Sequence, residues 1–233
     1  MSKIIYLQDY NKRKNRRGKH TQLERILHFK MEKKPTSMEV INQIRNDEDL
    51  KDDISQCAKK ILEVFEIDAD KQYVPIVKIL NLLGIKTYKQ KMKPDELSAY
   101  LSVDPRYYAK YGTTKIACVN EKDTDGHMRF ALAHELAHYI FDYNEAKDPT
   151  FYSTYMKNSQ DKDYKEDRAN EFAANLLMPA DIFIKKRMCF EKEEENSKPD
   201  VIARLADYFG VSTESILKRY IEVENIVEVQ IEG

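Results

Sequence analysis

The chain has 233 residues, of which 42% are hydrophobic and 34% charged, and its net charge is −1. This length suits one domain, or one domain with a small appendage. The three cysteines are far apart and odd in number, and no apolar run approaches the roughly 20 residues of a membrane span, which excludes a disulfide framework and a membrane protein. Because Ile4–Leu7 is too short for the apolar region of a signal peptide, we predict a cytoplasmic protein.

The N-terminal segment is strongly basic. Residues 1–34 contain eleven Lys or Arg and three Asp or Glu, so they carry +8 and the rest of the chain −9. The dense cluster at residues 12–20 could bind nucleic acid or an acidic partner. A solvated basic arm is the simpler interpretation, because basic runs are unspecific and no aromatic residues interleave this one to stack on bases. Residues 1–53 are predicted to form a basic arm, helical at 21–31, followed by helices.

The next part of the chain alternates helices with short strands. The spacing of apolar residues predicts three helices, at 37–46, 54–66 and 74–83, with an acidic hinge at 47–53. Runs of β-branched and aromatic residues predict three strands, at 85–88, 97–103 and 115–119. The sequence therefore predicts a small sheet directly before the segment that carries the chemistry, and one edge of such a sheet can pair with an extended peptide.

The run His134-Glu135-Leu136-Ala137-His138 carries the clearest chemical signal. On a helix, His134 and His138 lie one turn apart on the same face and can both bind one zinc ion. Glu135 is rotated away from direct ligation but can still take a proton from a water at the metal. The flanking residues are apolar and predict a buried helix, where two histidines without a partner would be costly. Two hydrogen-bonded core histidines are the alternative.

A catalytic zinc site needs a third protein ligand, and a second amphipathic helix at 166–178 offers three carboxylates. Glu166 is the preferred ligand because it lies on the face of this helix that carries small alanines, which permit close packing. Asp167 is rotated by about 100°, and Glu171 points away from the alanine face. Asn170, one turn after Glu166, could orient a ligand histidine. A solvated acidic residue in a first helical turn is the alternative for Glu166.

The two motifs together resemble the ImmA/IrrE family of metallo-endopeptidases. The resemblance rests on Arg-Phe-Ala-Leu-Ala-His-Glu-Leu-Ala-His at 129–138 and on Glu-x-x-Ala-Asn-x-Phe-Ala-Ala-x-Leu-Leu-Met-Pro at 166–179, and it covers roughly Ile54 to Tyr220. It implies one zinc ion per chain on His134, His138 and Glu166, with Glu135 as the general base, as in gluzincins. Ala131 departs from the family, where Thr is common.

The resemblance also implies a fold and a substrate. The expected fold is α+β and mostly helical, with a zincin-like core, a small three-stranded antiparallel or mixed sheet before the active-site helix, and a C-terminal helical hairpin. The expected domains are the arm and helices at 1–53, the metallopeptidase core at 54–190, and the hairpin with a tail at 191–233. Several family members cleave a helix-turn-helix repressor and switch genes on after stress, so such a repressor is the expected protein substrate.

The segment between the two motifs is long and polar. Residues 144–163 are rich in tyrosine and contain Pro149, which predicts a flap over the cleft that is ordered in part at best. Tyr152 and Tyr155 could donate a hydrogen bond to an oxyanion, although surface tyrosines are the simpler interpretation.

Residues 205–217 resemble the two core helices of a helix-turn-helix, with Gly210 in the turn and Ser212 as a cap. The second helix begins Thr-Glu-Ser, whereas a helix that reads DNA needs Arg, Lys, Asn or Gln near its start. We therefore predict a hairpin that packs on the catalytic core. The alternation at 226–231 predicts a last strand or a loose tail.

A different class of function remains possible from the sequence. In it the chain is a non-catalytic regulatory protein that binds DNA or a repressor through the basic arm and the C-terminal hairpin, and zinc is absent or structural. Structural zinc sites usually have four ligands and are rich in cysteine, and no cysteine lies beside the histidine motif, so the peptidase interpretation is preferred.

Overall fold

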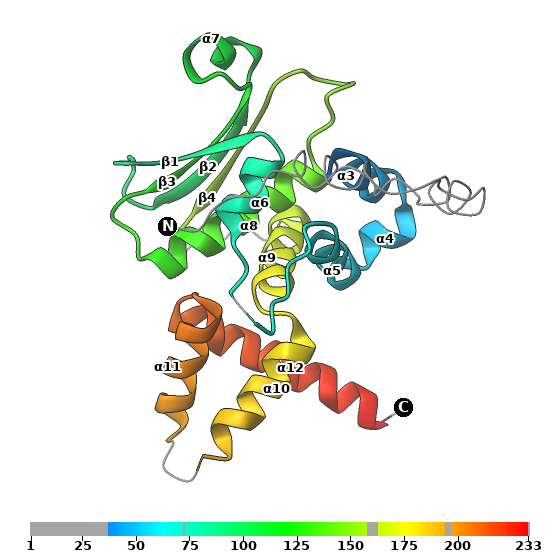
Figure 1. Cartoon of the computed structure of the whole chain (residues 1–233), viewed down its shortest axis with the longest axis vertical. Helices are drawn as coiled ribbons and strands as arrows, with labels where there is room; N and C mark the ends of the chain where they lie inside the picture. The colour runs from blue at the N-terminus through cyan, green and yellow to red at the C-terminus, as the bar shows by residue number, and fades with distance from the viewer. Residues whose placement is uncertain (1–36, 72, 158–162, 194–196, 233) are drawn as a thin grey trace, which may run out of the picture. The chain divides into compact units, whose positions relative to one another are not determined.

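A computed structural model describes residues 37–71, 73–157, 163–193 and 197–232 (Figure 1). The predicted basic arm and its helix at 21–31 lie outside these residues. The helices are α3 (Ser37–Asn46), α4 (Glu48–Asp52), α5 (Ile54–Val64), α6 (Ile76–Leu82), the short η1 (Pro105–Tyr107), α7 (Tyr108–Tyr111), α8 (Asp125–Phe141), α9 (Tyr164–Leu177), α10 (Ala180–Glu191), α11 (Lys198–Phe209) and α12 (Thr213–Glu232). The strands are β1 (Ile85–Gln90), β2 (Leu97–Val103), β3 (Lys115–Asn120) and β4 (Phe151–Met156).

The predicted α+β fold, with its small sheet and C-terminal helices, is confirmed. The sheet has the order β1-β3-β2-β4, with β1 parallel to β3 and β2 antiparallel to both β3 and β4. The three predicted strands are present, and the structure adds a fourth. The acidic hinge at 47–53 contains the short helix α4.

The fourth strand corrects the prediction of a flap at 144–163. Residues 151–156 pair with β2, so that Phe151 lies opposite Val103 and Thr154 opposite Tyr100. Four of the six residues in the run Phe-Tyr-Ser-Thr-Tyr-Met are aromatic or β-branched, so the run has strand propensity of its own, which the polar residues around it obscured. This pairing makes β4 an edge strand of the sheet.

The motif helix α8 packs between the sheet and α9 (Figure 1). Its residues 131–140 are all buried, against inward-facing sheet residues such as Ala99, Leu101 and Ala117. On the far side, α5 packs on α9. At the C-terminal end of α8, the Arg45 guanidinium of α3 donates hydrogen bonds to the carbonyl oxygens of Tyr139 (2.6 Å) and Ile140 (3.0 Å). The core around α8 therefore includes α3, and these contacts fix the helix at both its flanks and its end.

The C-terminal hairpin packs on α8 and α9, as predicted. Arg129 of α8 donates a hydrogen bond to the carbonyl of Gly210 in the turn (2.7 Å), which has the positive φ of 63° expected of a helix-ending glycine. Buried Arg219 of α12 donates to the Met178 carbonyl (3.1 Å) and to the side-chain oxygen of Asn175 (2.9 Å) at the end of α9. These buried hydrogen bonds hold the hairpin against both helices.

The chain continues as helix to Glu232, so the prediction of a last strand or a loose tail at 226–231 is wrong. No glycine or proline follows Thr213 until the last residue, so nothing local ends α12. Within the described residues, no helix has both the length and the apolar character needed to cross a membrane.

Gly126 lies where α8 touches the turn of the hairpin, and a β-carbon there would lie 2.6 Å from the Val211 carbonyl carbon. We expect Gly126→Ala to lower the free energy of unfolding by about 1–3 kcal/mol, because backbone must shift to relieve the overlap. Urea denaturation measures this change. Asp125→Ala, at the neighbouring exposed position, should cost less than about 1 kcal/mol. Equal stability of the two variants would contradict the tight contact.

Candidate metal centre

Three side chains from two helices converge on one point. His134 and His138 project from α8, and Glu166 projects from the first turn of α9. The two Nε2 atoms are 3.0 Å apart. That of His134 lies 3.1 Å from Oε2 of Glu166, and that of His138 lies 3.1 Å from Oε1. Among the described residues this is the one group of His, Cys, Asp or Glu whose spacing could hold a metal ion. The sequence-predicted ligands are therefore together, and Asp167 and Glu171 are not part of the group.

The hydrogen bonds of the two imidazoles fix which nitrogens face the cluster. Nδ1 of His134 lies 3.0 Å from the side-chain oxygen of Asn170, and Nδ1 of His138 lies 2.8 Å from a carboxylate oxygen of Asp142. Both oxygens can only accept, so each Nδ1 donates and each Nε2 is free to bind a metal. Two neutral imidazoles would then direct their Nε2 lone pairs at the same point as the Glu166 carboxylate. That donor set fits a cation.

The spacing of the donor atoms also fits. Bond lengths of about 2.0–2.2 Å in a tetrahedral zinc site place neighbouring ligand atoms roughly 3.3–3.5 Å apart. The separations of 3.0–3.1 Å in the cluster are close to this range. The residues present therefore match the group that the motif predicts.

The charges of the cluster depend on its surroundings. Burial lowers the pKa of His134. Burial also acts to lower the pKa of His138, but the hydrogen bond to Asp142 and the nearby carboxylates outweigh it and leave this pKa raised. The His134 imidazole lowers the pKa of Glu166, so this carboxyl is ionised at neutral pH. A proton on His138 would compete with a metal, and metal binding is therefore expected to weaken in acid.

Glu135 is fully buried beside the cluster, and burial raises its pKa to about 7. The Ser153 hydroxyl of β4 donates a hydrogen bond to Oε2. Oε1 is buried and has no hydrogen-bond partner among the described residues. A buried acceptor without a partner is costly, and a water at the cluster would satisfy it. Glu135 thus has one oxygen fixed by the protein and the other available to a proton donor.

Asp142 is a functional candidate that the sequence reasoning missed. It binds His138 with one oxygen and accepts a hydrogen bond from Arg168 of α9 with the other (2.8 Å). Such a carboxylate orients a metal-binding imidazole and raises its basicity. The signal was available, because Asp142 follows His138 by four residues, the spacing that places two residues on one helix face.

The two tyrosines considered as oxyanion donors lie on opposite faces of β4. Tyr152 is 61% exposed, and its ring lies 5.7 Å from that of Tyr100 on the outer face of the sheet. Tyr155 faces α8, with its ring centroid 4.6 Å from that of His134, and burial raises its pKa to about 12. Only Tyr155 is therefore close to the metal cluster.

A cleft of about 670 Å³ lies beside the cluster. It is lined by Glu166 and Asn170 at one side, by Tyr155 of β4, and by Ser215 and Lys218 at the start of α12. This volume is typical of a pocket that binds a ligand. The start of α12 therefore forms a wall of the cleft instead of projecting away from the core.

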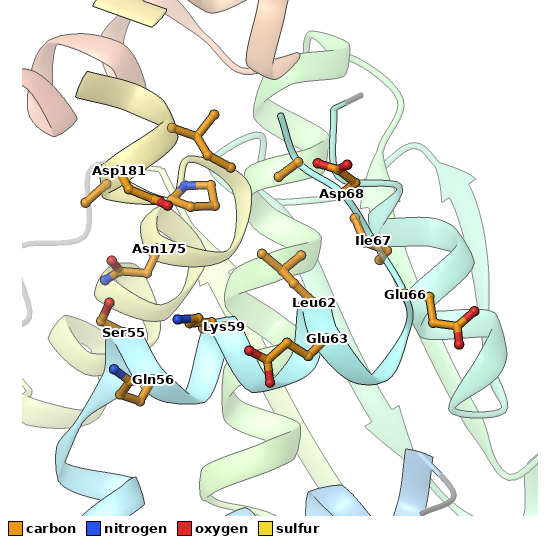
Figure 2. A pocket seen from close by; sticks show the side chains of 14 residues that line it. Ser55, Gln56, Lys59, Leu62, Glu63, Glu66, Ile67, Asp68, Asn175 and Asp181 are labelled. Atoms are coloured by element: carbon orange, nitrogen blue, oxygen red, sulfur yellow. The ribbon is translucent and has the colours of Figure 1, made fainter. Parts of the chain in front are cut away.

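A second pocket, of about 660 Å³, lies between α5 and the start of α10 (Figure 2). Figure 2 shows acidic side chains around it, among them Glu63, Asp68 and Asp181, together with apolar residues such as Leu62. It contains no histidine or cysteine and none of the residues of the metal cluster.

A match to a protein-family model agrees with this site. A protein-family model described as "IrrE N-terminal-like domain", Peptidase_M78, matches residues 81–220, which is more than half of the chain. No curated protein matches the sequence. A solved structure, a Mycobacterium tuberculosis transcriptional regulator, is similar at 16% identity and a TM-score of 0.43 over 76% of this chain and 49% of that one. The chain thus spans about half the length of that protein.

Removing the Asp142 carboxylate should weaken metal binding. We expect Asp142→Ala to lower zinc affinity about 10- to 100-fold, because the His138 imidazole loses its orienting partner. Competition with a chromophoric chelator measures the affinity. The exposed Asp125→Ala variant controls for loss of a negative charge. Unchanged affinity in a folded Asp142→Ala protein would show that the imidazole needs no such partner.

Proposed function

Because the chain belongs to the Peptidase_M78 family of IrrE N-terminal-like domains, we propose that it is a zinc-dependent endopeptidase of the gluzincin type. The observation that carries the proposal is the convergence of His134, His138 and Glu166 beside a buried glutamate with one unpartnered oxygen. Three ligands leave a position open for water, which distinguishes a catalytic zinc site from a closed structural one.

Each residue of the site has a distinct role in the proposed mechanism. His134, His138 and Glu166 would hold zinc, which when bound supplies Lewis acidity that polarises the peptide carbonyl and activates water. Glu135 takes the proton of the attacking water and later passes it to the leaving amine. A pKa near 7, raised by burial, suits a group that must both accept and release a proton. Asn170 and Asp142 keep the two imidazoles in the required orientation.

The edge strand β4 is the proposed binding site for the peptide backbone. Within the described residues, β4 pairs only with β2, so its other edge can hydrogen-bond to an extended segment. Ser153 on this strand contacts Glu135, which brings the strand and the general base together. A substrate strand beside β4 would enter the cleft with its backbone near the cluster.

We propose a cytoplasmic DNA-binding repressor of the helix-turn-helix type as the substrate, which would make the enzyme a switch of gene expression. The resemblance of the motifs to ImmA/IrrE peptidases supports this. The charge of residues 35–233 supports it as well, because they carry a net −9 and DNA-binding proteins are basic.

The alternative of a non-catalytic DNA-binding protein has less support. Glu214, at the start of α12, lines the cleft and carries a negative charge that DNA phosphates would repel. The basic cluster at 12–20 lies outside the described residues. A salt-dependent shift of duplex DNA by metal-free protein would favour this alternative.

The zinc content of purified protein tests the ligand set. We expect about one zinc per chain in the wild type and little in His138→Ala or Glu166→Ala, because two ligands hold zinc weakly. Elemental mass spectrometry measures the ratio, and circular dichroism confirms that the variants are folded. A full zinc content in Glu166→Ala would show that another residue is the third ligand. Absence of zinc from a folded, zinc-supplemented wild type would contradict the proposed zinc peptidase.

Glu135→Gln tests the general base. We expect this variant to keep zinc but to lose activity about 10²- to 10⁴-fold, because an amide cannot accept the proton of the water. Cleavage of the helix-turn-helix protein encoded nearest to this gene, followed by mass spectrometry, measures the loss. Equal cleavage by the two proteins would rule out Glu135 as the base.

A further inference from the structure

We propose that Ser153 is a positioning residue for the reaction, whose hydroxyl holds one oxygen of the Glu135 carboxylate and leaves the other for the proton of the attacking water. The inference rests on the proposed peptidase function and adds the group that keeps the general base in place. A base takes a proton only from within hydrogen-bond reach, so the rotation of the carboxylate matters as much as its presence.

The Glu135 carboxylate has few polar partners. It is fully buried, and the inward-facing sheet residues beside α8, such as Ala99 and Leu101, are apolar. Among the described residues, Ser153 is the only side chain that donates a hydrogen bond to Glu135. The backbone of Leu101, opposite Ser153 in the sheet, also lowers the pKa of Glu135, and it is kept in every side-chain variant. Ser153 is therefore the one side chain placed to fix the rotation of the carboxylate.

The pairing of β4 with β2 sets the position of the Ser153 hydroxyl. Ser153 lies opposite Leu101 and faces α8, whereas its neighbours Tyr152 and Thr154 lie on the other face of the sheet, because side chains alternate along a strand. A serine side chain has a single χ angle, so its hydroxyl moves little once the backbone is fixed. A glutamate has three χ angles and needs a partner to select one rotamer. The sheet thus supplies the rigid member of this pair.

Loss of this hydroxyl would leave both oxygens of Glu135 without a side-chain donor. A buried acceptor without a partner is unfavourable, so the carboxylate would rotate to reach whatever donors the metal cluster offers. In the structure, Oε2 is held by Ser153 and Oε1 is the oxygen without a hydrogen-bond partner among the described residues. By holding Oε2, Ser153 keeps Oε1 free for the one proton that the reaction requires it to accept.

A hydroxamate inhibitor tests this role without a peptide substrate. Benzyloxycarbonyl-leucine hydroxamate binds zinc through its two hydroxamate oxygens, and its hydroxyl proton passes to the neighbouring base, here Glu135. We expect Ser153→Ala to bind this compound about 10- to 100-fold more weakly and to keep its zinc, because the base loses its orienting partner. Ser153→Thr keeps the hydroxyl and should bind like the wild type. Calorimetry on zinc-loaded protein measures the affinities, and circular dichroism confirms that each variant is folded.

The Glu135→Gln background shows whether Ser153 acts through the base. A glutamine cannot take the hydroxamate proton, so Ser153→Ala should cause no further loss of affinity in that background. Ser102→Ala is the matched control and should leave the affinity unchanged. It also removes a buried serine hydroxyl from the sheet, but this hydroxyl lies 3.1 Å from that of Tyr107, away from α8.

Three results would overturn the inference and leave the zinc peptidase intact. The first is equal affinity of Ser153→Ala and the wild type. The second is an equal loss in the wild-type and Glu135→Gln backgrounds, which would show a packing role. The third is a folded Ser153→Thr protein that binds as weakly as Ser153→Ala. A wild type that binds zinc but not the hydroxamate would overturn the proposed function, and the inference with it.

Discussion

Two imidazoles and two carboxyl groups are gathered around one point of a mostly apolar core, and the rest of the structure depends on satisfying their polar atoms. Burial of an ionisable group without a partner is costly. Three elements meet this demand, since α9 supplies Glu166 and Asn170, the end of α8 supplies Asp142, and β4 supplies Ser153. Among the described residues, one oxygen of Glu135 remains without a hydrogen-bond partner, and the two imidazole Nε2 atoms face each other and Glu166, where a cation would bind. The arrangement of polar partners therefore marks the site as clearly as the motif does.

The strand β4 connects this buried chemistry to the surface. Its inner face holds the general base through Ser153 and packs Tyr155 against His134, while none of the described residues pairs with its outer edge. A strand has side chains on alternating faces and backbone groups at its edges, so one short segment can position catalytic groups and a substrate backbone at the same time. This explains why a segment of six residues in a polar stretch is ordered as part of the sheet.

The C-terminal hairpin has the sequence features of a helix-turn-helix but takes part in the cleft. Contact between the turn and Gly126, together with the hydrogen bond from Arg129 to Gly210, fixes it on α8. Its second helix then lies with Ser215 and Lys218 along the cleft beside the metal cluster. Helical hairpins of this kind are defined by local turn chemistry, and their function depends on what they pack against.

The sequence by itself determined the elements and the central motif. Apolar periodicity located the helices before and after the sheet, and the four-residue spacing of His134 and His138 placed both on one helix face, because these signals are local. Only the tertiary structure decided which distant groups complete the site. The choice of Glu166 over its neighbours was an argument about helix faces that packing alone could settle in space. Ser153 had no signal, and nothing in the sequence distinguished Tyr155 from Tyr152, since their positions depend on the register of β4 against β2 and on the distance from β4 to α8, which are non-local and are not encoded in any short stretch of the chain.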